Sequence, residues 1–403
     1  MQKFEKLPEV ALHLGEVFSK QGYEIALVGG SVRDFFLKKS ETESFAKLEP
    51  DGFPANNNDK KASDYDFTTS AKPDEILAVV KPLAKDLWTV GKKFGTIGGT
   101  IFNEKNEIVK FEITTYRADK YFDNSRKPQV KFGKTLLDDL CRRDFTINSM
   151  AVKLPDLELI DEFGGINDLA AKKLKTPIEP EKSFSDDPLR IMRLFRFMAQ
   201  LDFLPDAKTL EAASNMADRL NIVSRERISE EFAKLIMTND PVLALDCMTK
   251  TGVMDLIIPE LPKLKLEIDE RGQHKDNYWH SLKVLQNGIV LAQKGDFSDN
   301  LTIRLALLLH DIGKPATRKF DNFGKVSFYG HDIVGSRLAY KRLMNLRFPK
   351  TVCQDVAKLI KLHMRFYGYA DSQWSDSAAR RYAHDAGDLL DLLHILARSD
   401  CTT

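Results

Sequence analysis

The hydrophobic pattern of this 403-residue chain changes its period near residue 175, and this change constrains the fold more than any other feature. Before it, strand-like apolar runs at 24–30, 94–102 and 108–116 alternate with a helix-like run at 74–84. After it, apolar residues recur at helical spacing through most of the remaining chain, and a last helical block begins near 276. We therefore predict an α/β head over residues 1–160, an all-α middle over 161–262 and an all-α end over 263–403.

The composition excludes several classes of protein. Charged residues make up 30% of the chain but the net charge is +1, so a nucleic-acid partner would need a local basic surface. The four cysteines are scattered without CxxC spacing, which argues against a disulfide framework and a zinc–thiolate site. The N-terminal stretch MQKFEKLPEV is too charged for a signal peptide, and no apolar run has membrane-spanning length. We expect a soluble, cytoplasmic protein with no membrane partner.

Two glycines, Gly29 and Gly30, end the first strand-like run in the stretch ALVGGSVRDFFL. Glycines at such a point let the backbone approach a phosphate closely, and the N-terminus of the following helix offers free N–H groups. Arg33 could add a forked contact to the same phosphate. The glycine spacing fits neither a dinucleotide-binding fingerprint nor a P-loop, and a plain strand–helix turn is the alternative explanation.

Carboxylates follow on two further strand-like runs. Asp64 and Asp66, in DYDFTT, are alternate residues, so we expect both side chains on the same side of a strand. Glu112, in FEITTY, offers a third carboxylate from a nearby strand. Two solvated aspartates at a strand end are the alternative for the D-x-D by itself. Since Mg²⁺ binds one or two carboxylates together with substrate phosphates, the features together predict metal-assisted attack on a nucleoside triphosphate.

Three arginines recur in the stretch DDPLRIMRLFRF. Arg190, Arg193 and Arg196 are three residues apart and therefore lie along one stripe of a helix. A solvated basic face is the alternative. The large apolar residues between them instead favour a helix that is half in the core and half in a binding pocket.

These motifs, together with LCRRDFTINSMA (140–151) and SFSDDPLRIMRLFRF (183–197), resemble the class II tRNA nucleotidyltransferase and bacterial poly(A) polymerase superfamily. The resemblance runs through essentially the whole chain. It implies a polymerase beta-like nucleotidyltransferase head, followed by neck and body helices, with two metals, expected to be Mg²⁺, on Asp64 and Asp66. By the same resemblance the expected nucleotide contacts are Gly30 and Arg33 to the triphosphate, Arg143 to the nucleotide, Asn148 on the ribose side, and Asp187 and Arg190 to the base.

The base-reading expectation has a chemical basis. Asp187 would accept from the exocyclic amine that cytosine and adenine both carry, and Arg190 would donate to ring acceptors. Uracil and guanine present a carbonyl where that amine should be, so they would leave Asp187 unpaired. The resemblance therefore implies template-independent addition of C, C and A to the 3′ end of tRNA from CTP and ATP.

Other functions stay open at this point. A poly(A) polymerase or an A-adding enzyme would share every head motif. The stretch 112–132 looks like the flexible loop of CCA-adding members, which weighs against a CC-adding enzyme. A phosphohydrolase with a nucleotide-binding regulatory head is a third alternative, although a binding module needs no paired metal carboxylates. The stretch from Arg33 to Asp64 is longer than the family's usual spacing because the polar segment 39–63 intervenes. We expect a surface loop there, and an inert insertion is favoured over a loop at the mouth of the site.

The C-terminal block carries a series of histidines and aspartates that resembles the HD phosphohydrolase motif. Imidazole and carboxylate ligands suit Mn, Fe, Ni or Mg more than a thiolate-type zinc site. A single buried histidine would more often be structural, but the whole series predicts one or two bound metals. These residue types do not decide whether the site hydrolyses phosphate esters at RNA 3′ ends. The expected ligands are His280, His310, Asp311, His331, His363 and Asp400.

The chain ends directly after the last of these expected ligands, in SDCTT. Members of the family resembled continue with further helices that help to bind tRNA. We therefore expect a truncated chain.

Overall fold

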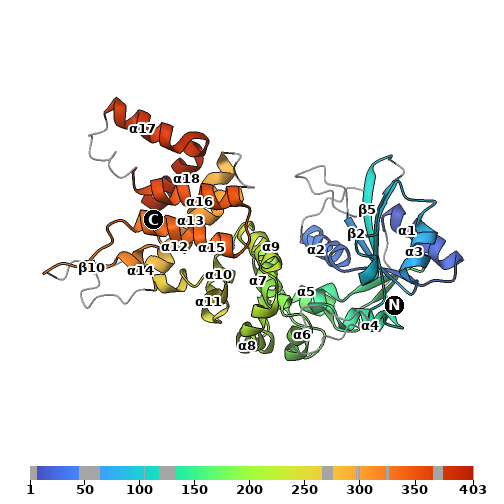
Figure 1. Ribbon diagram of the computed structural model, residues 1–403. Helices are drawn as coiled ribbons and strands as arrows, with labels where there is room; N and C mark the ends of the chain where they lie inside the picture. Colours follow the sequence, from blue (N-terminus) through green and yellow to red (C-terminus); the bar gives the residue numbers. More distant parts are fainter. Residues whose placement is uncertain are drawn as a thin grey trace. The chain divides into compact units, whose positions relative to one another are not determined.

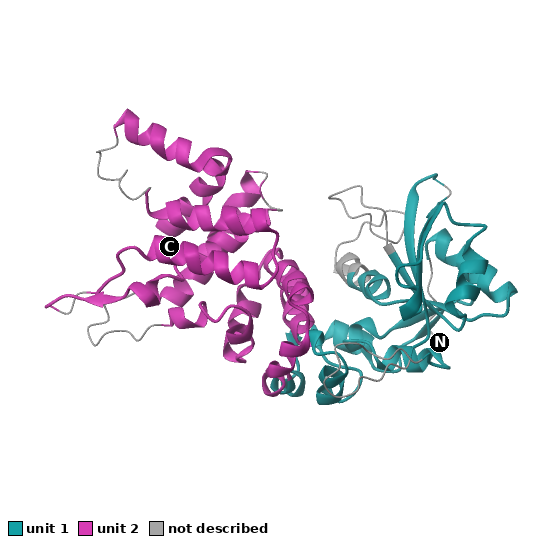
Figure 2. Cartoon of the chain, in the orientation of Figure 1, with its two compact units in different colours: residues 1–190, 204–212 teal, residues 191–203, 213–403 magenta. Residues whose placement is uncertain are grey.

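The computed structural model describes residues 7–44, 64–103, 105–117, 132–265, 276–295, 297, 300–323, 326–365 and 375–402; for 38–44 and Asp64 it describes the backbone alone. The chain divides into two compact units, residues 1–190 with 204–212 and residues 191–203 with 213–403 (Figure 2). The division falls inside helix α7 (Leu189–Leu201), directly after Arg190.

The first unit is built on a seven-stranded mixed sheet with the strand order β3-β4-β5-β2-β1-β6-β7 (Figure 1). Strands β2 and β5 are parallel, and the other neighbouring pairs are antiparallel. The strands are β1 (Ile25–Val28), β2 (Asp64–Thr69), β3 (Asp86–Trp88), β4 (Thr96–Phe102), β5 (Ile108–Thr115), β6 (Ala151–Leu154) and β7 (Glu158–Ile160).

Alternate strand residues are buried on opposite faces of this sheet, because side chains have a period of two. Leu27, Phe67 and Ile113 belong to the main hydrophobic core, together with residues of α1 and α3. Ala26 and Val28 pack on the other face with residues of α4. The helices of this unit are α1 (Glu9–Lys20), α2 (Gly30–Ser44), α3 (Pro73–Val80), α4 (Leu136–Cys141), α5 (Gly165–Ala170) and α6 (Pro180–Asp186).

The second unit is helical. Its C-terminal part is organised around α13, in which seven consecutive residues from Ile303 are buried, and which packs against α12, α16 and α18. Burial on all sides is typical of a helix that lies inside a bundle, and one of the seven buried residues here is the charged Arg304. The helices beyond α7 are α8 (Ala207–Asn215), α9 (Arg225–Ile236), α10 (Val242–Lys250), α11 (Val253–Ile257), α12 (Asn277–Lys294), α13 (Leu301–Leu309), α14 (Lys314–Thr317), α15 (His331–Asn345), α16 (Lys350–Leu362), α17 (Asp376–Ala386) and α18 (Leu390–Cys401).

The predicted order along the chain, an α/β head followed by helical parts, is confirmed, with three corrections. Helix α2 continues through Ser44, so the segment predicted as a loop over 39–63 begins as helix, and residues 45–63 lie outside the described residues. The middle contains a two-stranded pairing of β8 (Lys173–Leu174) with β9 (Leu204–Pro205). The C-terminal part contains a small ribbon of β10 (Lys319–Phe320) and β11 (Val326–Ser327). These pairs are too short to produce a periodic signal in the sequence.

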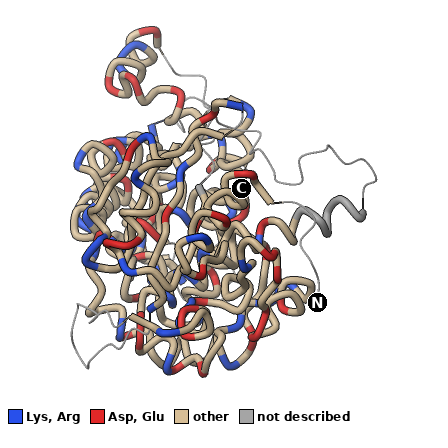
Figure 3. Tube along the Cα trace, turned by 90° about the vertical axis from the view of Figure 1, so that its right-hand side faces the viewer, with Lys and Arg blue, Asp and Glu red and all other residues tan. Residues whose placement is uncertain are grey.

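Charged residues of both signs are interspersed along the chain (Figure 3), in keeping with the net charge of +1. The cysteines are free thiols. Among the described residues, no helix combines the length and apolar character needed to cross a membrane.

Candidate functional site

The Gly-Gly turn joins the end of β1 to the start of α2, as the sequence predicts. Gly29 has a φ of +74°, in the left-handed region that favours glycine. A Cβ atom at this position would lie 3.2 Å from Nη1 of Arg143 and 3.9 Å from Oδ2 of Asp66. The turn therefore brings together three of the residues that the sequence singled out in separate motifs.

Two of the three expected carboxylates are neighbours across the sheet. The parallel pairing of β2 with β5 places Asp66 opposite Glu112, and both residues are exposed. Their chain neighbours Phe67 and Ile113 are buried in the core, so the two carboxylates lie on the face opposite to that core. Asp64 is the first residue of β2, and its side chain is outside the described part. Exposed carboxylates on adjacent strands suit a hard divalent cation such as Mg²⁺.

Arg33 is directly connected to the RRDFTIN motif. Its Nη1 donates to Oδ1 of Asn148 at 2.9 Å, and Nδ2 of Asn148 donates to Oδ1 of Asp144 at 3.0 Å. Its Nε donates to Asp34 at 2.7 Å. Arg33, Asp144 and Asn148 are all buried. The residues expected on the triphosphate side and on the ribose side are thus parts of one hydrogen-bonded network.

Asp139 is a site residue that the sequence reasoning missed. It is fully buried, and its carboxylate binds Arg142 through Oδ1 and Arg143 through Oδ2, the latter at 3.0 Å. Burial would raise the pKa of this carboxyl, but the guanidinium groups of Arg143 and Arg142 hold it below its ordinary value. The sequence did contain a signal: Asp139 lies near the end of a helix, three residues before Arg142 and four before Arg143, a spacing at which side chains on a helix meet. Asp139 fixes the side chain of Arg143 beside Gly29.

The expected base-reading residues are held by hydrogen bonds within their own motif and to the RRDFTIN motif. Oδ1 of Asp187 accepts from the N–H of Leu189 at 3.2 Å. Arg190 is buried and donates through Nη1 to the hydroxyl of Ser183 at 2.7 Å and through Nη2 to the carbonyl of Arg142. This last contact connects the base-reading motif to the RRDFTIN motif.

The other two arginines of α7 differ from Arg190. Nε of Arg196 lies 2.7 Å from Oε2 of Glu231, and its guanidinium stacks on Phe197 with 4.2 Å to the ring centroid. Arg193 lies over the same ring at 5.5 Å. Arg196 is therefore committed to an internal ion pair, and a role of Arg193 and Arg196 in nucleotide binding stays a prediction.

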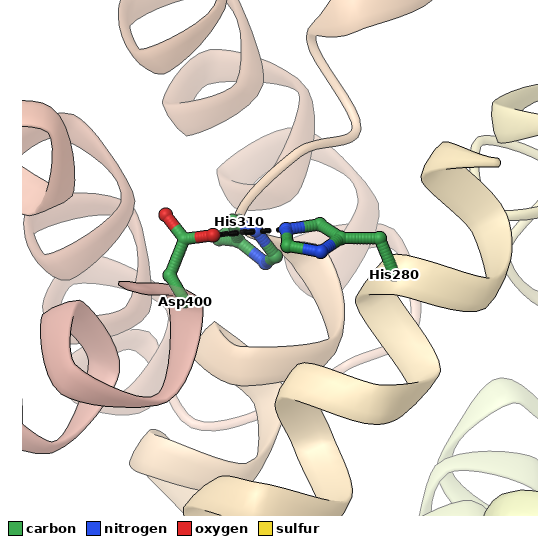
Figure 4. Close-up of side chains that lie close together, drawn as sticks. All are labelled: His280, His310 and Asp400. Atoms are coloured by element: carbon green, nitrogen blue, oxygen red, sulfur yellow. Dashed lines mark hydrogen bonds and ion pairs between the residues drawn. The ribbon is translucent and has the colours of Figure 1, made fainter. Parts of the chain in front are cut away.

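In the second unit, the six expected metal ligands come together from five segments. Figure 4 shows the side chains of His280, His310 and Asp400, whose ligand atoms lie within 4.8 Å of one another. The ligand atoms of a second group are equally close to one another. Nε2 of His280 is 2.8 Å from Oδ1 of Asp400. The second group consists of Asp311, His331 and His363. His310 connects the two groups into one cluster. Its Nε2 lies 3.7 Å from Oδ1 of Asp400, in its own group, and 3.3 Å from Oδ2 of Asp311, in the other.

Three of the histidines are oriented as metal ligands are. The Nδ1–H groups of His310, His331 and His363 donate to the carbonyl three residues earlier in the chain, at 3.0, 2.9 and 2.6 Å. Their buried Nε2 atoms have no hydrogen-bond partner among the described residues. A backbone carbonyl that fixes the tautomer in this way leaves the other nitrogen's lone pair for a metal. The residues present therefore fit a divalent metal.

The electrostatics of the cluster agree with this fit. Burial lowers the pKa of His310, but Asp311 and Asp400 outweigh it and raise the pKa to about 10. Burial, together with His310, lowers the pKa of His363 to about 4. The two carboxylates thus favour positive charge at the centre of the cluster, which is the charge that a divalent cation supplies.

Two neighbours of this cluster were missed. Nζ of Lys314 lies 2.6 Å from Oδ2 of Asp311 and donates to Oδ1 of Asn277 at 3.2 Å. A Cβ atom at Gly313 would lie 2.1 Å from the carbonyl oxygen of His331, so only glycine allows this approach. The signal was the stretch HDIGK itself, in which a glycine and a lysine follow the metal-ligating pair.

Family comparisons match three consecutive regions. Residues 25–175 match the "Poly A polymerase head domain", residues 202–264 the "Probable RNA and SrmB- binding site of polymerase A", and residues 277–403 the "HD domain".

Curated relatives cover different shares of the chain. A "CCA-adding enzyme" from Bacillus velezensis is 37% identical over 264 residues, which are 65% of this chain and 57% of that protein. One from Lactococcus lactis is 35% identical over 290 residues, 70% of this chain and 66% of that protein. An "A-adding tRNA nucleotidyltransferase" from Deinococcus radiodurans is 30% identical over 378 residues, 92% of this chain and 75% of that protein. The chain thus spans little more than half of the Bacillus relative.

Solved structures agree on the fold. A CCA-adding enzyme in an apo form superimposes with a TM-score of 0.68 at 20% identity, covering 99% of this chain and 84% of the other. The Thermotoga maritima CCA-adding enzyme, solved as a complex with "tRNA_CCA", superimposes with a TM-score of 0.65 at 19% identity, covering 98% and 83%. With the family matches and the Deinococcus relative, the conclusion is that this chain belongs to the tRNA nucleotidyltransferase and poly(A) polymerase family.

Proposed function

We propose that this chain is a CCA-adding tRNA nucleotidyltransferase, which adds C, C and A to the 3′ end of tRNA from CTP and ATP without a nucleic-acid template. The proposal is supported by the CCA-adding relatives and by the head motifs around the Gly29 turn. We place the enzyme in the cytoplasm and keep the domain boundaries 1–160, 161–262 and 263–403 as part of the proposal.

In this proposal the head binds the triphosphate at Gly29, Gly30 and Arg33, next to Arg143. Asp64, Asp66 and Glu112 hold Mg²⁺. Mg²⁺ held there would neutralise the triphosphate and assist loss of the proton from the tRNA 3′ hydroxyl. The 3′ oxygen would then attack the α-phosphate in line, and pyrophosphate would leave as the bond between the α- and β-phosphates breaks. Asn148 supports the ribose side through its hydrogen bond to Arg33.

Base choice depends on Asp187 and Arg190 in the proposal. The carboxylate of Asp187 accepts from the amine of cytosine or adenine, and Arg190 donates to a ring acceptor of the same base. Discrimination against uracil and guanine follows because each would leave Asp187 without a donor. A site that must pair a polar group rejects such analogues strongly.

The observation that carries the proposal is the pairing of Asp66 with Glu112 across β2 and β5, beside the turn that holds Gly29 against Arg143. The test is incubation of the protein with tRNA lacking its C-C-A end and with each labelled nucleoside triphosphate. We expect CMP and AMP incorporation in wild type and none in Asp66→Ala. Asp74→Ala is the matched control, because Asp74 is an exposed aspartate of α3 with an ion pair to Lys92. Near-normal incorporation by Asp66→Ala would refute the assignment.

A second candidate is favoured by one comparison. The A-adding Deinococcus relative aligns in sequence over 92% of this chain, whereas the two curated CCA-adding sequences cited above align over 65% and 70%. The same assay separates the candidates. An A-adding enzyme would extend tRNA ending in C-C by one AMP and would not use CTP, whereas a poly(A) polymerase would add AMP repeatedly. Residues 118–131, most of the segment that resembles the flexible loop, are outside the described residues.

For the C-terminal part we propose a metal-dependent phosphohydrolase that removes 3′ or 2′,3′-cyclic phosphates from RNA ends. His280, His310, Asp311, His331, His363 and Asp400 would hold Mn, Ni, Fe or Mg, which when bound activates a water molecule. The buried Nε2 atoms of three of these histidines, which have no hydrogen-bond partner in the part of the chain that the structure describes, support this proposal. If the chain instead released phosphate but added no nucleotide to any tRNA, the head would be a regulatory nucleotide-binding module.

A further inference from the structure

In the described part of the chain, the guanidinium of Arg143 is hydrogen-bonded to one side chain, that of Asp139. Nε and Nη2 of the arginine both donate to Oδ2 of this fully buried carboxylate, at 3.3 and 3.0 Å. No backbone carbonyl in the described ranges duplicates these bonds. Removal of the Asp139 carboxylate would therefore leave the guanidinium without a hydrogen bond from that part of the chain.

The third nitrogen of the guanidinium, Nη1, takes no part in these bonds and lies beside the Gly29 turn. A Cβ atom on Gly29 would be 3.2 Å from Nη1 and 3.9 Å from Oδ2 of Asp66, so Nη1 is on the side of the turn where triphosphate and metal are proposed to bind. The side chain of Arg143 is 20% exposed. The arginine thus extends from a buried carboxylate to the surface of the proposed site, with one nitrogen there to donate.

The carboxylate of Asp139 is itself fixed from several sides. Oδ2 binds Arg143, whereas Oδ1 binds Arg142 and accepts from the N–H of Arg117 at 3.4 Å. Burial would raise the pKa of Asp139, but Arg143 and Arg142 hold this pKa below its ordinary value, so the group is charged at neutral pH. A planar guanidinium bound at two nitrogens by a fixed, charged carboxylate has little rotational freedom.

We propose that Asp139 is a positioning residue for the nucleoside triphosphate: it binds Nε and Nη2 of Arg143 and so directs Nη1 to the phosphates at the Gly29 turn. Asp139 does not touch the nucleotide itself. An arginine that is already fixed binds an anion more tightly, because less side-chain freedom is lost on binding. This inference rests on the proposed nucleotide-adding function.

The test measures the KM for CTP on tRNA lacking C-C-A, at saturating tRNA, because KM does not depend on the fraction of the enzyme that is folded. Asp139→Ala removes both acceptor oxygens. We expect it to raise the KM for CTP about tenfold, the effect of one hydrogen bond to a charged group, and to leave the KM for tRNA unchanged. Arg143→Ala should raise the KM for CTP at least as much. The double variant should equal Arg143→Ala, since Asp139 acts through Arg143.

Arg143→Lys tests the division of the guanidinium without removing the buried carboxylate. Lysine keeps the positive charge and can pair with Asp139, but it has one nitrogen on a shorter side chain than arginine. The ammonium that pairs with Asp139 cannot also extend to the turn. We therefore expect the KM for CTP in Arg143→Lys to rise as far as in Arg143→Ala. If Asp139→Ala fails to fold, this variant decides the question by itself.

Asp246→Ala is the matched control, because Asp246 is a buried aspartate of the second unit that pairs with Lys250 at 2.7 Å and accepts from the Tyr278 hydroxyl at 3.2 Å. Its KM for CTP should equal that of wild type. An unchanged KM in folded Asp139→Ala, a wild-type KM in Arg143→Lys, or an equal rise in Asp246→Ala would overturn the inference while nucleotide addition by wild type still stood. Absence of addition by wild type would overturn the proposed function, and the inference with it.

Discussion

Replacing Gly29 by alanine should separate the site role of this glycine from its conformational role. The φ of +74° makes alanine strained at this position, at a cost of about 1 kcal/mol in the free energy of unfolding. The added Cβ would also lie 3.2 Å from Nη1 of Arg143, so this guanidinium must move by a few tenths of an ångström. Since a misplacement of about 1 Å can cost roughly 10²-fold in rate, we expect kcat/KM for CTP to fall by about tenfold.

Gly22→Ala is a control for the conformational cost alone. Gly22 has a φ of +79°, and a Cβ there would meet nothing within 4 Å. Urea unfolding should give both variants a similar loss of stability, whereas steady-state incorporation of CMP should fall only in Gly29→Ala. Equal activity of the two variants would show that the approach of Gly29 to Arg143 is irrelevant to catalysis. Loss of activity in Gly22→Ala would show that stability limits the assay.

The two metal sites should be separable. Alanine at both His310 and Asp311 should remove bound transition metal, measured by elemental analysis, and stop phosphate release from a cyclic-phosphate RNA end, while CMP incorporation stays. Asp66→Ala should stop CMP incorporation and leave the bound transition metal and the phosphate release unchanged. A folded double variant that lost both activities would contradict this. Asp139→Asn should be less stable than wild type near pH 7 by about 3 kcal/mol, because a fully buried carboxylate that binds two arginines is lost. The pKa of Asp139 is lowered in the folded state, so its stabilisation is present above the unfolded value of about 3.9 and is lost as pH falls through the folded pKa. Urea unfolding at a series of pH values should therefore show a shallower acid loss in Asp139→Asn, and parallel curves would refute the assignment. Arg304→Met should lower stability by about 2 kcal/mol, because Nη1 of this buried arginine donates to two carbonyls at the end of α9, at 3.1 and 2.6 Å. An unchanged Tm would contradict this reading.

The sequence predicted the strands and helices well wherever a single period extended over enough residues. The apolar run that became β1 and the helical stripe that became α7 needed no tertiary information. The boundary of α2 was wrong, because its polar C-terminal turn carries no amphipathic signal. The pairs β8–β9 and β10–β11 were missed because two residues per strand are too few for a pattern.

Local sequence also identified most of the candidate site residues, because their chemistry requires particular residue types at fixed spacings. A D-x-D on a strand, a Gly-Gly turn and an H…HD…H…H…D series can be recognised without coordinates. The supporting residues could not be identified in this way. Asp139 and Ser183 are ordinary residues in helices, and their importance lies in what they touch.

The sequence by itself thus determined the longer elements, the family and the list of candidate site residues, since these depend on residue type and spacing. Only the tertiary structure decided which of them meet. The parallel register of β2 and β5 set Asp66 beside Glu112, and five helical segments brought the four histidines and two aspartates of the cluster together. It also decided that Arg196 is committed to Glu231 while Arg190 is held by Ser183. Such contacts join residues far apart in the chain, and their distances depend on how sheet and helices pack, which no local pattern encodes.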